Sequence, residues 1–146
     1  MIDPCGVHEK KVKRLAKIVK ETNAKVVMSS SWRFSWWNTP YEKQFVDEKK
    51  LTGLLNKYNI KVIDITPRSS DGRRDKEIQE WLTKHEGIVK RFVILDDERY
   101  DLECFVGSHL VQTSSVGKGQ KIIGYNRADA GLKNKHVKQA IEILTK

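Results

Sequence analysis

The sequence predicts a three-layer α/β/α Rossmann-like domain with a mostly parallel sheet, and two features support this fold class. Helical and strand-like hydrophobic periods alternate from end to end of the 146 residues. The strand-like runs are short and almost continuously apolar, as expected for parallel strands that helices cover on both faces. The chain has no internal repeat and no low-complexity tract, so we expect residues 1–146 to form a single domain.

The individual elements follow from the spacing of apolar residues. Helices are predicted over residues 7–22, 41–58, 75–86 and about 137–144, with a short helix or turn at 99–105. Strands are predicted over residues 25–28, 60–66, 91–97 ("RFVILDD") and 109–114 ("HLVQTS"). Asp75 is the expected N-cap of the third helix. We expect a loop at 29–39 and an irregular insertion or hairpin at 114–130.

Composition and charge restrict the class of partner. The net charge is +9, which favours anionic partners, nucleic acid first and phosphorylated small molecules second. A solvated surface rich in lysine is the alternative, because the lysines of the first helix lie on one face, as in any amphipathic helix. No apolar run is long enough to span a membrane. With no signal-like segment and two isolated cysteines, we expect a reduced, cytoplasmic protein.

Carboxylates follow the third predicted strand. "LDD" places Asp96 and Asp97 at its carboxyl end, and Asp101 follows one helical turn later. Ligands of open parallel sheets bind beyond this edge. Three neighbouring carboxylates repel one another unless a cation compensates them, and hard oxygen ligands with open positions suit Mg²⁺. The alternative is a solvent-facing acidic turn that caps the next helix.

Hydroxyl and cationic groups are expected at the same edge. "SSSWR" ends the first strand with Ser29, Ser30 and Ser31 followed by Arg33, groups that bind phosphate oxygens well. A serine-rich turn anchored by a buried Trp32 is an equal alternative. A second basic group, Arg73, Arg74 and Lys76, opens the third helix, where it could neutralise a phosphate or simply be surface charge.

Four aromatic residues follow the first strand closely: Trp32, Phe34, Trp36 and Trp37. Such a cluster beside a site could stack on nucleobases, or it could form a lid packed on the core. We expect Trp32 to pack on the core of the domain, and Trp36 or Trp37 to be exposed or to face a partner.

The order of these motifs resembles the haloacid dehalogenase-like (HAD) superfamily, and in particular the small HAD domain of "Swiss Army Knife" RNA-repair proteins. The motifs that carry the resemblance are "KVVMSSSWR", "VIDITP", "GRRDKEIQEWL", "RFVILDD" with a further Asp, "VQT" and a late "GL". The resemblance implies a Mg²⁺-dependent phosphohydrolase that acts on phosphorylated nucleic-acid ends or nucleotides.

The resemblance also implies roles for single residues. Ser30 or Ser31 would bind the transferring phosphoryl group: strand length favours Ser30, whereas an S-x-R reading with Arg33 favours Ser31. Lys76 would be the cation that offsets charge around the nucleophile, with Arg74 as the other candidate. Asp96, Asp97 and Asp101 would hold Mg²⁺.

The sequence departs from the superfamily at one decisive point. Members begin with a strand ending in D-x-D-G, whose first Asp attacks phosphorus, and this chain contains no D-x-D-G. Without its nucleophile the covalent route has no first step. The first central strand of the family is therefore missing, which would expose two strand edges. The two strands could pair directly, or a local segment such as "KIIGY" or a second chain could fill the gap between them. Alternatively, the chain could be a fragment of a longer protein.

Two functions remain open from the sequence. One is a phosphohydrolase domain that is inactive alone because it lacks the nucleophilic Asp. The other is a catalytically silent HAD-like protein that binds nucleic acid or a protein partner through its basic surface and aromatic loop.

Overall fold

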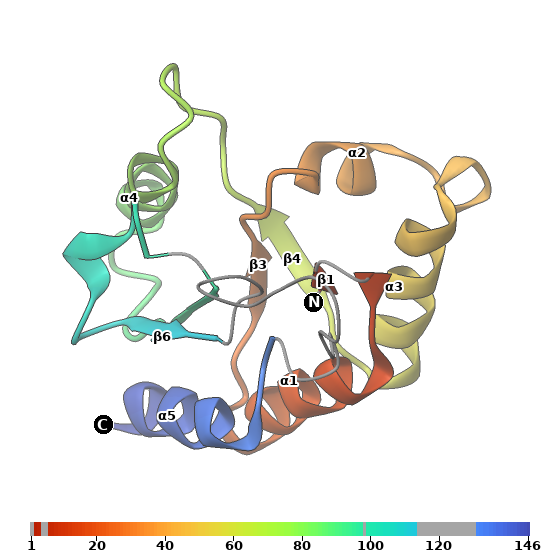
Figure 1. Ribbon diagram of the computed structural model, residues 1–146. Helices are drawn as coiled ribbons and strands as arrows, with labels where there is room; N and C mark the ends of the chain where they lie inside the picture. Colours follow the sequence, from red (N-terminus) through yellow and green to blue (C-terminus); the bar gives the residue numbers. More distant parts are fainter. Residues whose placement is uncertain (1, 4–5, 98, 114–130) are drawn as a thin grey trace, which may run out of the picture.

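The computed structural model describes residues 2–3, 6–97, 99–113 and 131–146 (Figure 1). Its helices are α1 (Glu9–Thr22), α2 (Arg33–Asn38), α3 (Val46–Lys57), α4 (Arg74–Lys84) and α5 (Asn134–Thr145), with 3₁₀ turns at Tyr41–Lys43 and Glu103–Phe105. Its strands are β1 (Ile2–Asp3), β2 (Gly6–Val7), β3 (Val26–Met28), β4 (Val62–Ile65), β5 (Ile94–Asp96) and β6 (Leu110–Gln112). The alternation of helices and parallel strands confirms an α/β fold.

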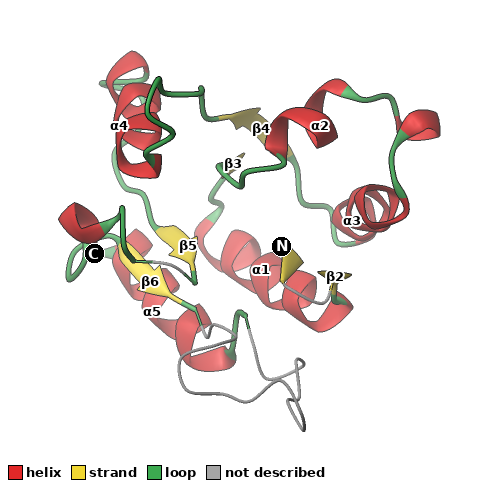
Figure 2. Cartoon of the chain, turned by 45° about the horizontal axis from the view of Figure 1, so that its top comes forward, coloured by secondary structure: helices red, strands yellow, loops and turns green. Residues whose placement is uncertain are grey.

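The strands form separate pairs. β3 pairs with β4 and β5 pairs with β6, both in parallel, whereas β1 and β2 form a small antiparallel pair (Figure 2). Among the described residues, β3 and β5 therefore each have a strand partner on one edge only. The hypothesis that these two strands close up and pair directly is wrong.

Alternate residues of β5 and β6 face two different cores, which gives this part of the molecule its layers. Ile94 and Leu110 pack with α4 and the 3₁₀ turn at Glu103–Phe105, while Leu95 and Val111 pack with the cluster that contains α1 and α5. Side chains alternate across a strand, so β5 and β6 lie between helices on both faces.

The larger core joins α1, α3 and α5. Val12, Leu15 and Ile18 lie at helical spacing on α1 and are buried against Val137 and Ala140 of α5. Asn23 ends α1 in a left-handed conformation, with its backbone N–H donating to the carbonyl of Val19. Figure 1 shows α1 and α5 together beneath β3 and β4.

Three local expectations need correction. The expected loop at 29–39 contains α2, because Trp32 and Trp36 lie one turn apart and both pack on the core. The N-cap of α4 is Arg73 rather than Asp75, which lies in the first turn. The pair β1–β2 precedes α1, where no strand was expected.

The expected insertion or hairpin at 114–130, with "KIIGY", lies outside the described residues. In the part of the chain that the structure describes, no helix has the length and apolarity needed to cross a membrane.

Candidate functional site

The carboxyl ends of β3 and β4 lie at one edge, as the parallel register requires. Met28 is opposite Ile65, and the backbone N–H of Thr66 donates to the carbonyl of Met28 at 3.0 Å. Ser29, Ser30 and Ser31 follow directly. The hydroxyls that end the first predicted strand therefore reach the same edge as the segment that follows β4.

Arg33 joins these two strand ends from inside the protein. It is only 3% exposed, and its guanidinium donates to the carbonyls of Ser29, Ser30, Thr66 and Pro67. Its remaining N–H faces the buried carboxylate of Glu77 at 3.3 Å. Burial lowers the pKa of Arg33, and Glu77 opposes that shift. All five donors of the guanidinium are thus engaged within the protein, so Arg33 has none left for a phosphate.

Arg74 is the cation that meets the carboxylates after β5. Its side chain donates to Asp96, and its backbone N–H donates to the Asp101 carboxylate at 2.8 Å. Asp101 therefore caps α4, because Arg74 is the first residue of that helix and its N–H has no partner inside the helix. The end of β5 and the start of α4 are held together by this one residue.

The other two cations of the α4 start face outward. Lys76 pairs with Asp71, and Arg73 pairs with Asp75 at 3.1 Å. Lys76 and the backbone N–H of Arg73 lower the pKa of Asp71 to about 2, and Arg73 lowers the pKa of Asp75. Gly72, at φ 68°, supplies the left-handed turn that leads into the helix. The structure brings Arg74, rather than Lys76, to the carboxylates.

A cavity of about 610 Å³ opens beside these residues. Its walls include Ser31, Arg74 and Asp101, together with Arg68, which sequence reasoning missed. The guanidinium of Arg68 lies 4.7 Å from the centre of the Phe34 ring. Its position three residues after the end of β4 was the available signal, because that strand ends at the same edge. The cavity thus combines hydroxyl, guanidinium and carboxylate groups.

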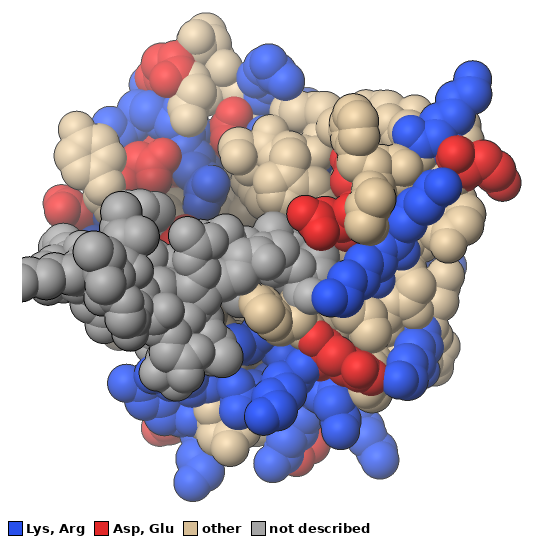
Figure 3. All heavy atoms as spheres, turned by 45° about the vertical axis from the view of Figure 1, so that its right-hand side comes forward, with Lys and Arg blue, Asp and Glu red and all other residues tan. Residues whose placement is uncertain are grey.

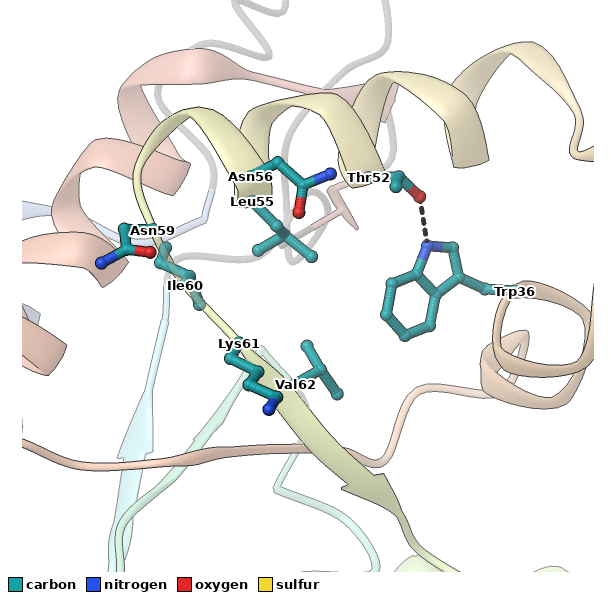
Figure 4. Close-up of a pocket in the computed structure, with 8 residues that line it drawn as sticks. All are labelled: Trp36, Thr52, Leu55, Asn56, Asn59, Ile60, Lys61 and Val62. Carbon is teal, nitrogen blue, oxygen red and sulfur yellow. Dashed lines mark hydrogen bonds between the residues drawn. The ribbon is translucent and has the colours of Figure 1, made fainter. Parts of the chain in front are cut away.

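The aromatic residues divide between packing and exposure. Trp36 packs on the core and its indole N–H donates to Thr52 at 3.0 Å, beside a second cavity of about 410 Å³ (Figure 4). Trp37 is 42% exposed, and Trp32 packs on the core. Among the tryptophans at 32, 36 and 37, Trp37 is therefore the one open to a partner.

Comparison with protein families finds a match to the HAD domain in Swiss Army Knife RNA repair proteins over residues 5–117. The chain belongs to this family. Searches of curated proteins and of solved structures give no match. The matched segment includes both strand pairs β3–β4 and β5–β6, α4 and the whole cavity.

HAD domains generally depend on Mg²⁺, so the donors near β5 can be tested for fit. The carboxylates of Asp96, Asp97 and Asp101 have the hard oxygen chemistry that Mg²⁺ prefers. Within the described residues, however, no three acidic, histidine or cysteine side chains come together as a metal site. Arg74 instead compensates Asp96 and contacts Asp101. The donor chemistry fits Mg²⁺, and a metal at Asp96 would have to share that carboxylate with Arg74.

Two buried hydroxyls at this edge of the HAD domain lack hydrogen-bond partners among the described residues: Ser30 Oγ and Thr66 Oγ1. A buried polar group without a partner costs stability, and such groups call for an explanation. Ser30 thus offers a free hydroxyl in the interior, whereas the exposed Ser31 lines the cavity. Both serines remain candidates for the phosphoryl-binding hydroxyl.

Thr66→Val is expected to raise the free energy of unfolding by about 1 kcal/mol, because it removes a buried, unpaired hydroxyl without changing side-chain shape. The matched control is Thr52→Val, since the Thr52 hydroxyl accepts from Trp36 and contacts Gln44. This control should lower the free energy of unfolding by about 1–3 kcal/mol. Urea unfolding measures both, and a loss of stability in Thr66→Val would show that its hydroxyl is satisfied in solution.

Proposed function

We propose that this chain is a HAD-type phosphohydrolase domain that binds the phosphorylated end of a nucleic acid or nucleotide in the cavity beside β3, β4 and α4. The observation that carries the proposal is the joining of Arg74 to Asp96 and Asp101 at the wall of a cavity that also contains Ser31 and Arg68. Cations and a hydroxyl suit phosphate oxygens. The carboxylates have the oxygen ligands that suit a metal ion.

Each residue has a separate role in this proposal. Ser30 or Ser31 binds the phosphoryl group, and Arg74, with Arg68, neutralises its charge. Arg33 positions the serines by holding their backbone carbonyls and does not touch the phosphate. Trp37, exposed on α2, is the aromatic residue that contacts the nucleic acid beyond the cavity. Arg73 and Lys76 remain paired with acidic neighbours at the rim.

Mg²⁺ would be held by the carboxylates of Asp96, Asp97 and Asp101. When bound, it would polarise a phosphoryl oxygen and offset the charge that builds up there. The protein's own contribution is to orient the phosphate with Arg74 and the serine hydroxyl.

Hydrolysis by this route needs a nucleophilic aspartate that the chain does not provide in a D-x-D motif. We propose that it comes from a strand placed between β3 and β5, either from a protein partner or from a second chain. Each of these strands has one edge without a strand partner among the described residues, and Val26, Val27 and Met28 of β3 are all only half-buried. The second candidate function, a silent HAD-like binder of nucleic acid or protein, is favoured by the same missing motif.

Phosphate release from a 3′- or 5′-phosphorylated RNA oligonucleotide, with and without Mg²⁺, tests the proposal. We expect no release by the chain alone. We expect Mg²⁺-dependent release after addition of a synthetic peptide with an apolar strand that ends in D-x-D. Asp97→Asn should abolish this release, and Glu86→Gln, an exposed change just beyond the C-terminal end of α4, should leave it intact.

Two outcomes would contradict parts of this account. Release by the chain alone that Asp97→Asn abolishes would mean that one of its own side chains is the nucleophile. No release with the peptide, together with salt-sensitive retention of the oligonucleotide, would leave the silent binder as the function.

A further inference from the structure

The positive charge of the chain is concentrated on α1. Lys10, Lys13, Lys17 and Lys20 are all exposed on this helix. Residues three and four apart lie on one face, so the four ammonium groups form a row. At about 1.5 Å of rise per residue the row is roughly 15 Å long, which corresponds to about four base pairs of a duplex.

α5 extends this row into a wider surface. Arg14 of α1 donates to the carbonyl of Leu132 at 2.9 Å, just before α5 begins. Lys135 and Lys138 are exposed on α5, and Lys133 is half-buried. Figure 3 shows Lys and Arg side chains gathered along the lower part of the molecule, where Figure 1 places α1 and α5. We name this surface, formed by the exposed side chains of α1 and α5, the α1–α5 face.

Few acidic groups offset this charge. Of the three acids on the two helices, Glu9 pairs with Lys57 of α3, Glu142 pairs with Lys146, and Glu21 is exposed near the end of α1. None of the ion pairs found among the described residues uses an exposed lysine between positions 10 and 20. The lysine row is therefore free to bind an external anion.

The positive charge of the α1–α5 face also affects the pKa of a buried histidine beneath it. His136, in the first turn of α5, is 3% exposed, and its pKa is lowered to about 4. Burial is the main cause, and the cations Lys135, Lys133, Lys11 and Arg14 add to it. Their charges thus act together around the start of α5.

The chemistry of the face selects one class of partner. Every exposed side chain of α1 and α5 is polar or charged, so the face offers no apolar side chain to insert into a membrane. Long lysine side chains on a smooth helical surface suit a row of phosphates, which they contact without reading sequence. We propose that the α1–α5 face binds the sugar-phosphate backbone of a nucleic acid. This inference rests on the proposed function in one respect, because it takes nucleic acid as the partner. The residues of the α1–α5 face do not line the phosphate cavity.

The test is the affinity for a fluorescent single-stranded RNA oligonucleotide with hydroxyl ends, measured at several salt concentrations. The α1 variant replaces Lys10, Lys13, Lys17 and Lys20 by Gln, a good helix former that keeps α1 intact. The matched control replaces four exposed lysines elsewhere by Gln: Lys50, Lys61, Lys84 and Lys90. Both variants lose the same charge. Circular dichroism and thermal unfolding verify that both remain folded.

We expect the α1 variant to bind at least tenfold more weakly and to reduce the slope of log K against log salt by about 2–3. The control should change both quantities much less. Equal losses in the two variants would overturn the proposal, because net charge alone would then explain binding. Equal affinity for an acidic polypeptide of the same charge would also overturn it, in favour of a protein partner.

The use of hydroxyl ends separates this inference from the proposed function. Such an RNA gives the phosphate cavity nothing to hydrolyse, so loss of phosphate release leaves the result on α1 unaffected. Conversely, a wild-type chain that acts on phosphorylated ends but does not bind this RNA would overturn the α1–α5 face alone.

Discussion

Replacement of Arg33 by Met is expected to lower the free energy of unfolding by about 3–5 kcal/mol, the usual effect of breaking a buried ion pair by removing one partner. Glu77, only 5% exposed, would be left as an uncompensated charge. The carbonyls of Ser29, Ser30, Thr66 and Pro67 would lose their donor as well. Urea unfolding monitored by tryptophan fluorescence measures the change.

The control for Arg33 is an ion pair that is exposed at the surface. Lys57 and Glu9 are in contact at the surface, and exposed pairs contribute little to stability. Lys57→Met should therefore change the urea midpoint only slightly. A second variant, Arg33→Met with Glu77→Met, should recover part of the loss, because no buried charge is then left unpaired. An Arg33→Met protein as stable as the Lys57→Met protein would contradict the role assigned to Arg33.

The second large effect concerns pH. The pKa of His136 is about 4 in the folded protein, against an ordinary value of 6.5 for an unfolded histidine. Between these values the unfolded chain binds a proton that the folded chain does not, so stability falls as pH falls from 6.5 to 4. The free energy of unfolding falls by about 2–3 kcal/mol in total. This loss begins near pH 6.5 and has fully developed below pH 4.

His136→Gln provides the control for this pH dependence. The side chain of His136 accepts a hydrogen bond from the backbone N–H of Lys133 at 2.8 Å, and a Gln at this position of a capping box can accept the same bond. The variant should keep the cap and lose the titration. We therefore expect a flatter dependence of the free energy of unfolding between pH 6.5 and 4, measured by urea unfolding at pH 7, 5.5 and 4.5. An equally steep decline in both proteins would assign the titration to another group.

Most elements could be predicted from the sequence because each carries a strong hydrophobic period. α1, with its buried Val12, Leu15 and Ile18, and the short apolar strands β3 and β5 are examples. The three serines follow β3, and Asp96 and Asp97 lie at the carboxyl end of β5, because position along a parallel strand decides which edge a residue reaches.

Other features depend on contacts between distant parts of the chain, which no local pattern reveals. Arg33 looks like a phosphate ligand in sequence, but its partners at Thr66, Pro67 and Glu77 are more than thirty residues away. The sequence pointed first to Lys76, with Arg74 as the other candidate. Both open the same helix, and only the pairing of Arg74 with Asp96 separates them.

The helix α2 shows a different limit. Its residues follow three serines and include bulky aromatics, so the segment has the composition of a loop beside a site. The helical signal was the spacing of Trp32 and Trp36, which pack on the core one turn apart. This packing turns Trp36 inward and leaves Trp37 exposed.

The most direct test of the phosphate cavity compares two RNA oligonucleotides of the same sequence, one with a 3′-phosphate and one with a 3′-hydroxyl. In the presence of Mg²⁺ we predict tighter binding of the phosphorylated RNA by the wild-type chain. Arg74→Gln and Asp97→Asn should remove this preference, while the α1 lysine variant should weaken both RNAs equally. Equal affinity of the wild-type chain for the two ends would contradict the assignment of the cavity to a terminal phosphate.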